Sequence, residues 1–210
     1  STRELFARSQ ALLGIETFDL VFLHDPEQRP WEEIAGPGGP LEALFGLRDE
    51  GKIRHVGIAG GPIDLLMNAI ETQPFEAVIT HNRYTLLNRA AEPLIEKCHR
   101  RGIPLFNAAP YGSGLLAKGP DQYPRYAYGQ AENQLVERAR ELEAICARYE
   151  VPLAAAALQF SLRERRIDGT IVGMSRPERI AQTIDFATLD IPNACWDELL
   201  AVPFDSEDLT

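Results

Sequence analysis

The chain has 210 residues, of which 45% are hydrophobic and 25% are charged, and its formal net charge is -10. These proportions are typical of globular domains and exclude disordered and fibrous proteins. The negative charge opposes binding to nucleic-acid phosphates and to anionic membranes, both of which attract clustered lysine and arginine. No run approaches the roughly 18 apolar residues of a membrane helix, and residues 1–10 are too polar for a signal peptide. We therefore expect one cytoplasmic domain without nucleic-acid or membrane partners.

The cysteines carry no sign of a disulfide framework or a metal site. Cys98, Cys146 and Cys195 are odd in number, lie far apart and fall within helical apolar patterns. A structural zinc site needs closely spaced ligand pairs such as CxxC, which the chain lacks. The sequence therefore predicts three buried thiols and no bound metal.

Five strand-like apolar runs, each ending in a small or polar residue, organise the sequence. They span Phe18–His24, Ile53–Ala59, Phe75–Thr80, Ile103–Asn107 and Gly169–Gly173. Because a helical segment follows each run, the pattern predicts an α/β fold of the TIM (β/α)8-barrel type. Five units are three fewer than a closed barrel has, and a complete barrel usually needs about 250 residues. We therefore expect residues 1–210 to form an incomplete barrel of about five βα units, the carboxyl-terminal portion with the first three strands absent.

The helices are predicted from apolar residues spaced three and four positions apart. They cover, in chain order, Leu5 to Leu13, Leu41 to Phe45, Ile63 to Ile70, Ala91 to Cys98, Leu135 to Tyr149, Val151 to Leu162, Ile180 to Ile184 and Cys195 to Leu200. Gly14, Gly51 and Gly102 are expected to end the helices that they follow. The stretch from Lys118 to Gln130 is rich in Gly, Pro and Tyr and predicts a long binding loop, and Phe204 to Thr210 predicts a polar end.

Alternation along the strands predicts which side chains fill the interior of the barrel. We expect the interior set to include Val21, Leu23, Val56, Ile58, Val78, Leu105 and Ile171. With only five strands, this set is expected to lack a facing layer, and the two outer strands are expected to expose unpaired backbone groups.

Polar side chains gather where the predicted strands end. Parallel barrels carry their chemistry at the carboxyl ends of the strands, so His24, His81, Asn82, Ser113 and Ser175 are expected to lie on one face. His24 ends the run FDLVFLH, and its imidazole is expected to project from the barrel mouth, where it could exchange a proton near neutral pH. A purely structural histidine remains the alternative.

The segment Gly112-Ser113-Gly114-Leu115-Leu116-Ala117 has the GxGxxA form of a dinucleotide-binding loop. That fingerprint requires a helix to begin at the loop, whereas Lys118-Gly119-Pro120 intervenes and no helical pattern resumes before about Asn133. We therefore interpret the segment as a phosphate-approach loop of another architecture, in which glycines let backbone N–H groups come close to an anion. A plain turn remains the alternative.

The segment that follows the last predicted strand also favours an anion. Ser175-Arg176-Pro177-Glu178 has the S-x-x-E form of a capping box, which predicts a helix start. Arg176 and Arg179 would place two cations in the first helical turn, where the helix dipole disfavours them unless an anion is bound. An ordinary capped helix with solvated arginines is the alternative.

Four motifs in this order carry a resemblance to a known family: FDLVFLHDP, HNRYTLLNR, NAAPYGSGLLAKGP and TIVGMSRPERI. The chain resembles the aldo-keto reductase superfamily, and within it the branch of D-threo-aldose 1-dehydrogenases and L-fucose dehydrogenases. The resemblance implies an oxidoreductase that transfers a hydride between NAD(P) and a carbonyl or hydroxyl carbon, oxidising an aldose at C1 or reducing an aldehyde or ketone. It also implies a catalytic tetrad of Tyr, Lys, Asp and His, of which His24 resembles the histidine. None of the chain's tyrosines matches the motif of the tetrad tyrosine.

The resemblance also implies a cofactor site. His81 takes the place of a family glutamine that binds the nicotinamide carboxamide, and Asn82 lies beside it. Gly112, Ser113 and Leu115 match the pyrophosphate loop. The adenosine end is matched by Gly173, Met174, Ser175, Arg179, Gln182 and Thr183, and Arg176 could meet a 2′-phosphate. The choice between NADP and NAD stays open.

Two readings besides the enzyme stay open. One is a non-catalytic nucleotide-binding or accessory protein, and the other is an inactive truncated product. The small-molecule carbonyl or sugar substrate belongs to the enzyme reading. Because of the open sheet, self-association or completion by an amino-terminal segment is also expected.

Overall fold

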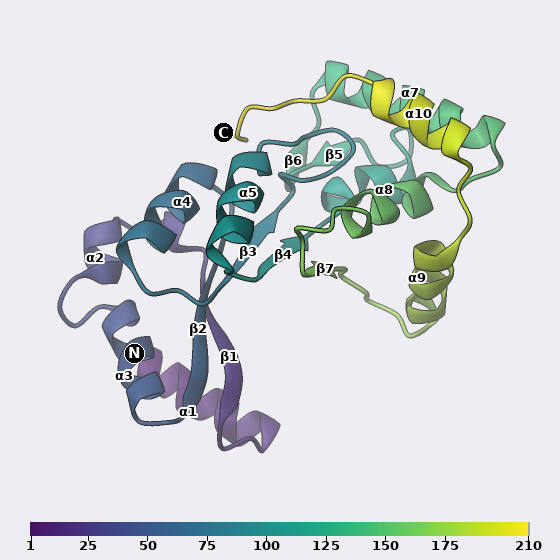
Figure 1. Cartoon of the computed structure of the whole chain (residues 1–210). Helices are drawn as coiled ribbons and strands as arrows, with labels where there is room; N and C mark the ends of the chain where they lie inside the picture. Colours follow the sequence, from purple (N-terminus) through teal and green to yellow (C-terminus); the bar gives the residue numbers. More distant parts are fainter. Residues whose placement is uncertain (210) are drawn as a thin grey trace.

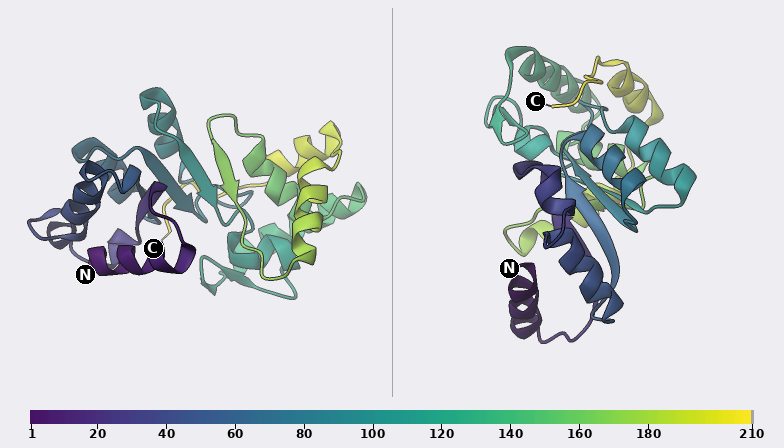
Figure 2. Two further views of the ribbon diagram at one scale, coloured as in Figure 1. Left: turned by 90° about the horizontal axis from the view of Figure 1, so that it is seen from below. Right: turned by 90° about the vertical axis from the view of Figure 1, so that its left-hand side faces the viewer.

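The computed structural model describes residues 1–209, in which five parallel strands form one sheet (Figure 1). The strands are β1 (Phe18–His24), β2 (Ile53–Gly60), β3 (Ala77–His81), β4 (Leu105–Ala108) and β7 (Gly169–Ile171), in the order β1-β2-β3-β4-β7. The predicted parallel α/β fold is confirmed. Within residues 1–209 the sheet is not closed, because β1 and β7 lie at its opposite edges. Figure 2 shows the earlier units at one end of the molecule and the later ones at the other.

Eight of the described helices lie where the periodicity predicted them, and two short ones, at Trp31–Ala35 and Leu115–Lys118, were not predicted. In chain order the helices are α1 (Thr2–Leu13), α2 (Trp31–Ala35), α3 (Pro40–Asp49), α4 (Ile63–Thr72), α5 (Glu92–Arg101), α6 (Leu115–Lys118), α7 (Asn133–Arg148), α8 (Leu153–Leu162), α9 (Glu178–Thr188) and α10 (Asn193–Ala201), with 3-10 turns η1 (Pro26–Gln28) and η2 (Gly112–Gly114). A short antiparallel ribbon, β5 (Arg125–Tyr126) and β6 (Gly129–Gln130), lies in the stretch predicted as a loop. The predicted start of α8 at Val151 is two residues early, because Pro152 is its N-cap.

Local caps explain why the helices begin and end where they do. The Ser1 side chain accepts a hydrogen bond from the Glu4 backbone, and Glu4 reaches back to Ser1 in a capping box. Gly14 and Gly102 adopt φ angles of 66° and 65° after α1 and α5, which confirms the predicted stops. None of the helices in the described residues is both long and apolar enough to cross a membrane.

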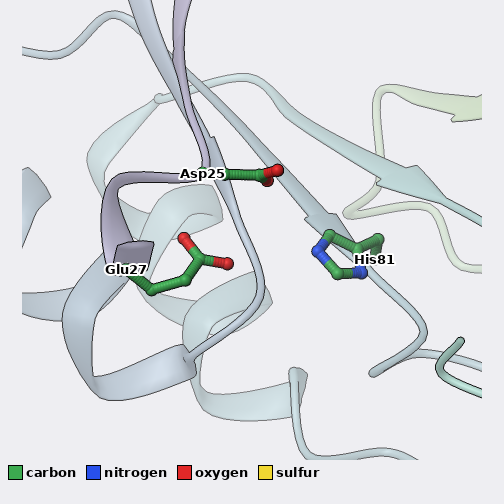
Figure 3. Close-up of side chains that lie close together, drawn as sticks. All are labelled: Asp25, Glu27 and His81. Atoms are coloured by element: carbon green, nitrogen blue, oxygen red, sulfur yellow. The ribbon is translucent and has the colours of Figure 1, made fainter. Parts of the chain in front are cut away.

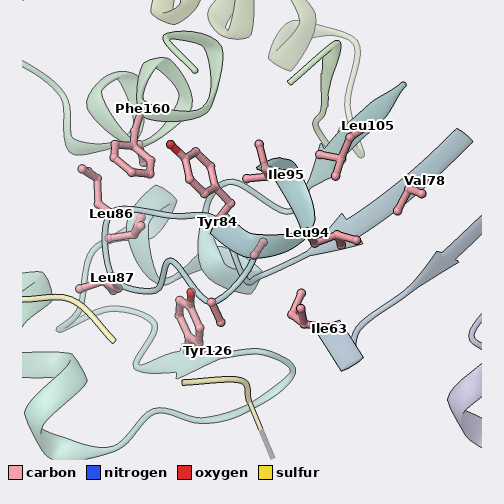
Figure 4. Packing of buried hydrophobic residues seen from close by; sticks show 14 of the residues in the cluster. Ile63, Val78, Tyr84, Leu86, Leu87, Leu94, Ile95, Leu105, Tyr126 and Phe160 are labelled. Atoms are coloured by element: carbon pink, nitrogen blue, oxygen red, sulfur yellow. The ribbon is translucent and has the colours of Figure 1, made fainter. Parts of the chain in front are cut away.

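One face of the sheet packs against the helices and forms the core (Figure 4). Leu23, Ile58, Val78 and Leu105 are paired in register across four strands and are at most 8% exposed. They pack with residues of α3, α4 and α5, and Val56 belongs to the same buried face. The three cysteines are also buried, as predicted.

The opposite face of the sheet has less cover, and here the sequence-based assignment of the barrel interior was wrong. Alternation places Phe22, Ile79 and Phe106 on this face, and all three are partly exposed. The rings of Phe22 and Phe106 meet edge to face at 6.5 Å. In the residues expected to be interior, only Ile171 lies on this face, and it is 43% exposed. Both faces of a parallel sheet are apolar, so periodicity alone could not tell which one met the helices.

A polar layer fixes α8 against the end of the sheet. The Asn107 side chain donates to the Tyr84 carbonyl at 2.9 Å and to Ser161 Oγ at 2.8 Å, and Ser161 Oγ lies 2.7 Å from Thr170 Oγ1. Buried polar groups need such partners because they have lost water. The Ala155–Ala157 run of α8 is fully buried, and its small side chains let the helix pack closely.

The carboxyl-terminal segment packs back against α7, the start of α4 and the loop after β3. Arg138 holds the Asp205 carboxylate with two bonds of 2.9 and 2.8 Å, and Asp208 pairs with Arg83 and accepts from the Ile63 backbone at 2.6 Å. Asp208 therefore caps the start of α4. Of the predicted polar end, only Thr210 lies outside the described residues.

An acidic residue after α8 gives a testable contribution to stability. Glu164 accepts from Arg166 at 2.7 and 2.8 Å, and this pairing holds the pKa of Glu164 down at about 2. Because the folded pKa is depressed, the stabilisation is present above the unfolded pKa near 4.5 and is lost as the pH falls towards 2. We expect Glu164→Gln to lower the free energy of unfolding at neutral pH by about 1–3 kcal/mol and to flatten its dependence on pH in that window. Urea unfolding across the acid range checks this, and an unchanged pH dependence would contradict it.

Candidate active site

His24 lies at the carboxyl end of β1 with its ring facing solvent. Its side chain is 75% exposed, and its Nδ1 lies 3.1 Å from Oδ2 of Asp25. Asp25 has a φ of 49°, a left-handed conformation that non-glycine residues rarely adopt. This conformation turns the chain so that two successive polar side chains end β1. The predicted projection of His24 from the end of the strand is thus observed.

A chain of hydrogen bonds joins β3 to the glycine-rich loop after β4. The Tyr128 backbone donates to Ser113 Oγ at 3.2 Å, and Ser113 Oγ donates to Asn82 Oδ1 at 3.2 Å. The Asn82 amide nitrogen in turn lies 3.0 Å from Nδ1 of His81. Since an amide nitrogen only donates, His81 Nδ1 accepts and the ring proton is on Nε2. Asn82 itself is fully buried, so it orients His81 instead of facing solvent.

The surroundings of His81 favour its neutral form. Burial lowers the pKa of His81, and the nearby Arg83 lowers it further, whereas Glu27 and Asp25 act in the opposite direction. The net effect is a pKa below the usual value, so the ring is neutral at pH 7. His81 therefore presents a fixed N–H donor at the edge of the sheet.

A cavity of about 360 Å³ lies between the loops that follow β4 and β7. Seven of the predicted cofactor residues line it: Ser113, Gly173, Met174, Ser175, Arg179, Gln182 and Thr183. The predicted set lacked the other lining residues, which are Ala109, Tyr111, Gly114, Ala117, Lys118, Ala154, Val172 and Phe186. Lys118 and Arg179 are the cations of the lining, and no Asp or Glu is among the described residues that form it. In a chain of net charge -10, such a lining favours an anion.

Contacts within the cavity wall hold its polar residues in place. Arg179 donates to Gln182 at 2.9 Å, and the Lys118 ammonium lies 3.9 Å from the centre of the Tyr123 ring. Burial raises the pKa of Tyr111, so this residue is a neutral phenol at pH 7. The wall therefore offers cations and hydrogen-bond groups together with the apolar Phe186.

The glycine-rich loop has a different structure from the one predicted. The one-turn helix α6 begins directly after the glycines, so the expectation of no helix before Asn133 was wrong. A methyl group at Gly112 would come within 2.2 Å of the Tyr126 ring, which explains the glycine there. The backbone N–H groups of Gly112, Gly114, Leu115 and Leu116 already donate within the turn. These four amides are therefore not free for an anion, and the Ser113 hydroxyl already donates to Asn82, which leaves the Lys118 ammonium as the charged group of this loop that lines the cavity.

The helix start at Ser175 also differs from the prediction. Pro177 is the N-cap of α9, and no side-chain capping bond is present, so the predicted capping box is absent. Ser175 instead lines the cavity. Helix α9 buries none of its residues, and Ile180 and Ile184 are 52% and 58% exposed. The S-x-x-E pattern therefore did not predict the cap, because Ser175 belongs to the loop that lines the cavity and only Glu178 belongs to α9.

Some predicted site residues lie outside the cavity wall. Leu115 is fully buried in the core, Gly112 packs against the Tyr126 ring, and Arg176 is exposed and does not line the cavity. His24, His81 and Asn82 form a second group at the ends of β1 and β3. Ser113 belongs to both, because it lines the cavity and bonds to Asn82.

Two acidic residues that sequence reasoning passed over lie beside His81 (Figure 3). Asp25, Glu27 and His81 each offer a ligand atom within 4.8 Å of the others. Figure 3 shows both carboxylates directed towards the imidazole. The sequence signal was only that Asp25 follows His24, because Glu27 and His81 are 54 residues apart and meet through the pairing of β1, β2 and β3.

A parallel βα sheet with a cavity at the carboxyl ends of its strands is the arrangement of (β/α)-barrel proteins, which carry their functional sites on that face. The chain matches the Aldo/keto reductase family over residues 1–202 and belongs to that family. It is 36% identical to the D-threo-aldose 1-dehydrogenase of Pseudomonas sp. over 199 residues, which are 94% of this chain and 60% of that protein. It is 31% identical to the pyridoxal 4-dehydrogenase of Microbacterium luteolum, over 92% of this chain and 59% of that protein.

Solved structures agree on the fold. An aldo-keto reductase from Bacillus halodurans, in its holo form, superposes with a TM-score of 0.74 at 19% identity and covers 99% of this chain and 68% of its own length. The TIM-barrel type of the sheet is thereby confirmed, in a form that is not closed. The chain spans about 60% of the length of the curated relatives that it matches.

Proposed function

We propose that the chain is the nucleotide-binding portion of an NAD(P)-dependent oxidoreductase of the aldo-keto reductase family. The observation that carries this proposal is the cavity between the β4 and β7 loops, where Lys118 and Arg179 face the same space without a carboxylate. Its shape and charge suit a dinucleotide laid across the strand ends, with the pyrophosphate near Lys118 and Ser113 and the adenosine end near Ser175, Arg179, Gln182 and Thr183. When bound, the nicotinamide would accept or supply the hydride.

His24 and His81 are proposed to act at the reacting end of this site. His24 would orient the substrate carbonyl or hydroxyl and bias the proton transfer to it. His81, whose Nε2 carries the proton, would donate to the nicotinamide carboxamide, and Asn82 would hold the ring in that orientation. The role of Asn82 is thus positioning and not direct contact.

The substrate is proposed to be an aldose oxidised at C1, or an aldehyde or ketone that is reduced. Two relatives with dehydrogenase names, for D-threo-aldose and for pyridoxal, support a carbonyl or sugar substrate. Both NAD and NADP remain candidates, because Arg176, the residue expected at a 2′-phosphate, lies outside the cavity wall. A cytoplasmic location remains a prediction from the sequence.

A second candidate function is a nucleotide-binding or accessory protein without catalysis. This function is favoured because most of the residues that the resemblance assigns to the cofactor line the cavity. By contrast, His24 alone resembles a residue of the catalytic tetrad. In either case the open edges β1 and β7 are proposed to pair with further strands, supplied by a completing segment or by another copy.

The two cations of the cavity provide the test. We expect Arg179→Ala to weaken binding of NAD⁺ or NADP⁺ by about 10- to 100-fold, because a hydrogen bond to a charged group contributes about 1.5–3 kcal/mol. Arg165→Ala is the matched control, since Arg165 is exposed and does not line the cavity. Calorimetric titration of both variants decides the matter. Equal affinity of the parent and the Arg179 variant would reject this placement of the nucleotide.

A further inference from the structure

The Arg83 side chain is buried beside the turn that follows β3, two residues after His81. It is 8% exposed, and its guanidinium donates to the His81 carbonyl at 3.3 Å and to the Leu209 carbonyl at 3.2 Å. Its Nε pairs with the Asp208 carboxylate. A guanidinium is planar and holds several acceptors in one fixed geometry. Arg83 therefore ties the backbone at His81 to the carboxyl-terminal segment.

The segment of residues 205–209 is itself held in place over the loop after β3, which it approaches from α10 (Figure 1). The Asp205 N–H donates to the Leu87 carbonyl at 2.8 Å. Oδ2 of Asp208 accepts from the Ile63 N–H at 2.6 Å, while its other oxygen takes part in the ion pair. The Asp208 carboxylate is thus fixed between the start of α4 and the buried guanidinium.

The loop after β2 provides a close-fitting surface for this guanidinium. A methyl group at Gly61 would come within 2.7 Å of Arg83 Nη1 and 3.1 Å of Nη2. The φ of Gly61 is not in the left-handed region, so the close approach explains the glycine and the backbone conformation does not. Any side chain at Gly61 would displace the guanidinium from its present position.

Fold stability alone does not account for an ion pair at this place. Burying two charges is costly, and replacing such a pair by apolar residues is often neutral or stabilising. The pair instead fixes a turn that other contacts leave strained. Asn82 has a φ of 59°, and its side-chain amide holds the His81 ring through Nδ1. A conformation of this kind persists only where the surroundings hold it.

We propose that Asp208 and Arg83 are positioning residues, which act through the turn after β3 to keep the His81 ring oriented with its Nε2–H towards the nicotinamide carboxamide. The inference rests on the proposed function for its ligand, although the orientation of the ring can be measured without any nucleotide. Neither residue lines the cavity, so binding of the adenosine and pyrophosphate parts should not depend on them. The carboxyl-terminal segment is then a part of the nicotinamide site.

Three variants separate position from charge and from general stability. Asp208→Asn removes the negative charge and keeps an oxygen for the start of α4, at a position that is 34% exposed. Gly61→Ala displaces the guanidinium without changing any charge. Asp205→Asn is the matched control, because it removes a carboxylate of the same segment whose partner is Arg138 and not Arg83.

The first measurement is the nitrogen NMR spectrum of the His81 ring in the full chain without nucleotide. A ring that keeps its proton on Nε2 gives two widely separated nitrogen signals, whereas exchange between the two tautomers brings them together. We expect Asp208→Asn and Gly61→Ala each to bring the signals closer together. Asp205→Asn should leave them as they are in the parent.

The second measurement compares NAD⁺ with ADP-ribose, which lacks the nicotinamide. We expect Asp208→Asn and Gly61→Ala to weaken NAD⁺ binding about 3- to 10-fold, the range for the loss of one hydrogen bond, and ADP-ribose binding less than about twofold. Asp205→Asn should leave both affinities unchanged. Calorimetric titration of the full chain provides these values.

Unchanged ring signals in Asp208→Asn and Gly61→Ala would overturn the inference. So would an equal loss of NAD⁺ and ADP-ribose binding, or the same changes in Asp205→Asn, because the ion pair would then serve the fold alone. Ring signals that move while the NAD⁺ affinity stays the same would also overturn it. A folded parent that binds neither nucleotide would reject the proposed function, and the ring signals would still decide whether Asp208 and Arg83 position His81.

Discussion

Supplied with NAD⁺ or NADP⁺ and D-arabinose, the 210-residue chain is expected to turn over at least about 100-fold more slowly than the same chain combined with three further βα units from a full-length relative. The reason is chemical. The mechanism that the resemblance implies needs a tyrosine as proton donor, and general acid catalysis contributes about 10²–10⁴ in rate. His24 is the only tetrad residue matched here, and its ring bonds to Asp25 in a solvent-exposed position.

The measurement is the absorbance of the reduced nicotinamide with the chain alone, with the added segment, and with His24→Ala in both settings. His24→Ala should reduce the rate of the combined protein and leave the chain alone at its low level. Turnover by the chain alone at the rate of complete relatives, abolished by His24→Ala, would contradict this account of the catalytic residues.

Covering the open face and edges of the sheet is expected to stabilise the chain by several kcal/mol. Phe22, Ile79 and Phe106 are partly exposed on that face, and a groove of about 470 Å³ follows β1 between Phe6 and Phe22. Covering apolar surface contributes about 25 cal/mol per Å², so each 100 Å² that a partner covers should add about 2.5 kcal/mol. The chain alone is therefore expected to associate as its concentration rises, and the added three-unit segment should suppress association and raise the unfolding temperature.

Two lysine variants separate the faces of the sheet. Phe22→Lys lies on the open face and should reduce association in light scattering while the fold is kept. Leu23→Lys lies on the helix-covered face, is 8% exposed in the parent, and should unfold the protein. A chain that stays monodisperse at all concentrations, and whose unfolding temperature the added segment does not change, would show that the exposed face of the sheet neither drives association nor destabilises the fold.

The element order of the fold could be predicted from the sequence because the apolar periodicity of each βα unit is local. Ile63, Leu66 and Ile70 repeat at helical spacing, and each is buried as the spacing requires. The facing of the strands could not be predicted, because Leu23 and Phe22 are both apolar and the two faces differ only in what packs on them. The capping box failed for a related reason, since Ser175 and Glu178 fit a local pattern that the loop geometry does not use.

In the candidate site, too, residues that are close in sequence could be predicted, whereas residues that the fold brings together could not. Ser175, Arg179 and Gln182 lie close together in one short segment, so their shared place in the cavity wall followed from local sequence. Lys118 and Tyr111 were missed because they enter the wall only through the turn that places α6 after the glycines. Glu27 was missed because its approach to His81 depends on three neighbouring strands, which no local pattern records.

The central claim is that the nucleotide lies between the β4 and β7 loops, and hydrogen exchange tests it most directly. On addition of NADP⁺ or NAD⁺ to the folded chain, the backbone amides of residues 111–118 and 173–183 should exchange more slowly, because the ligand would cover this cavity wall. The amides of α3 and α10, which do not line the cavity, serve as the internal reference. Slower exchange that includes both loop segments, with α3 and α10 unchanged, is the result that we expect. A folded chain whose exchange is unchanged by saturating amounts of either nucleotide, or slowed only outside these segments, would contradict the claim.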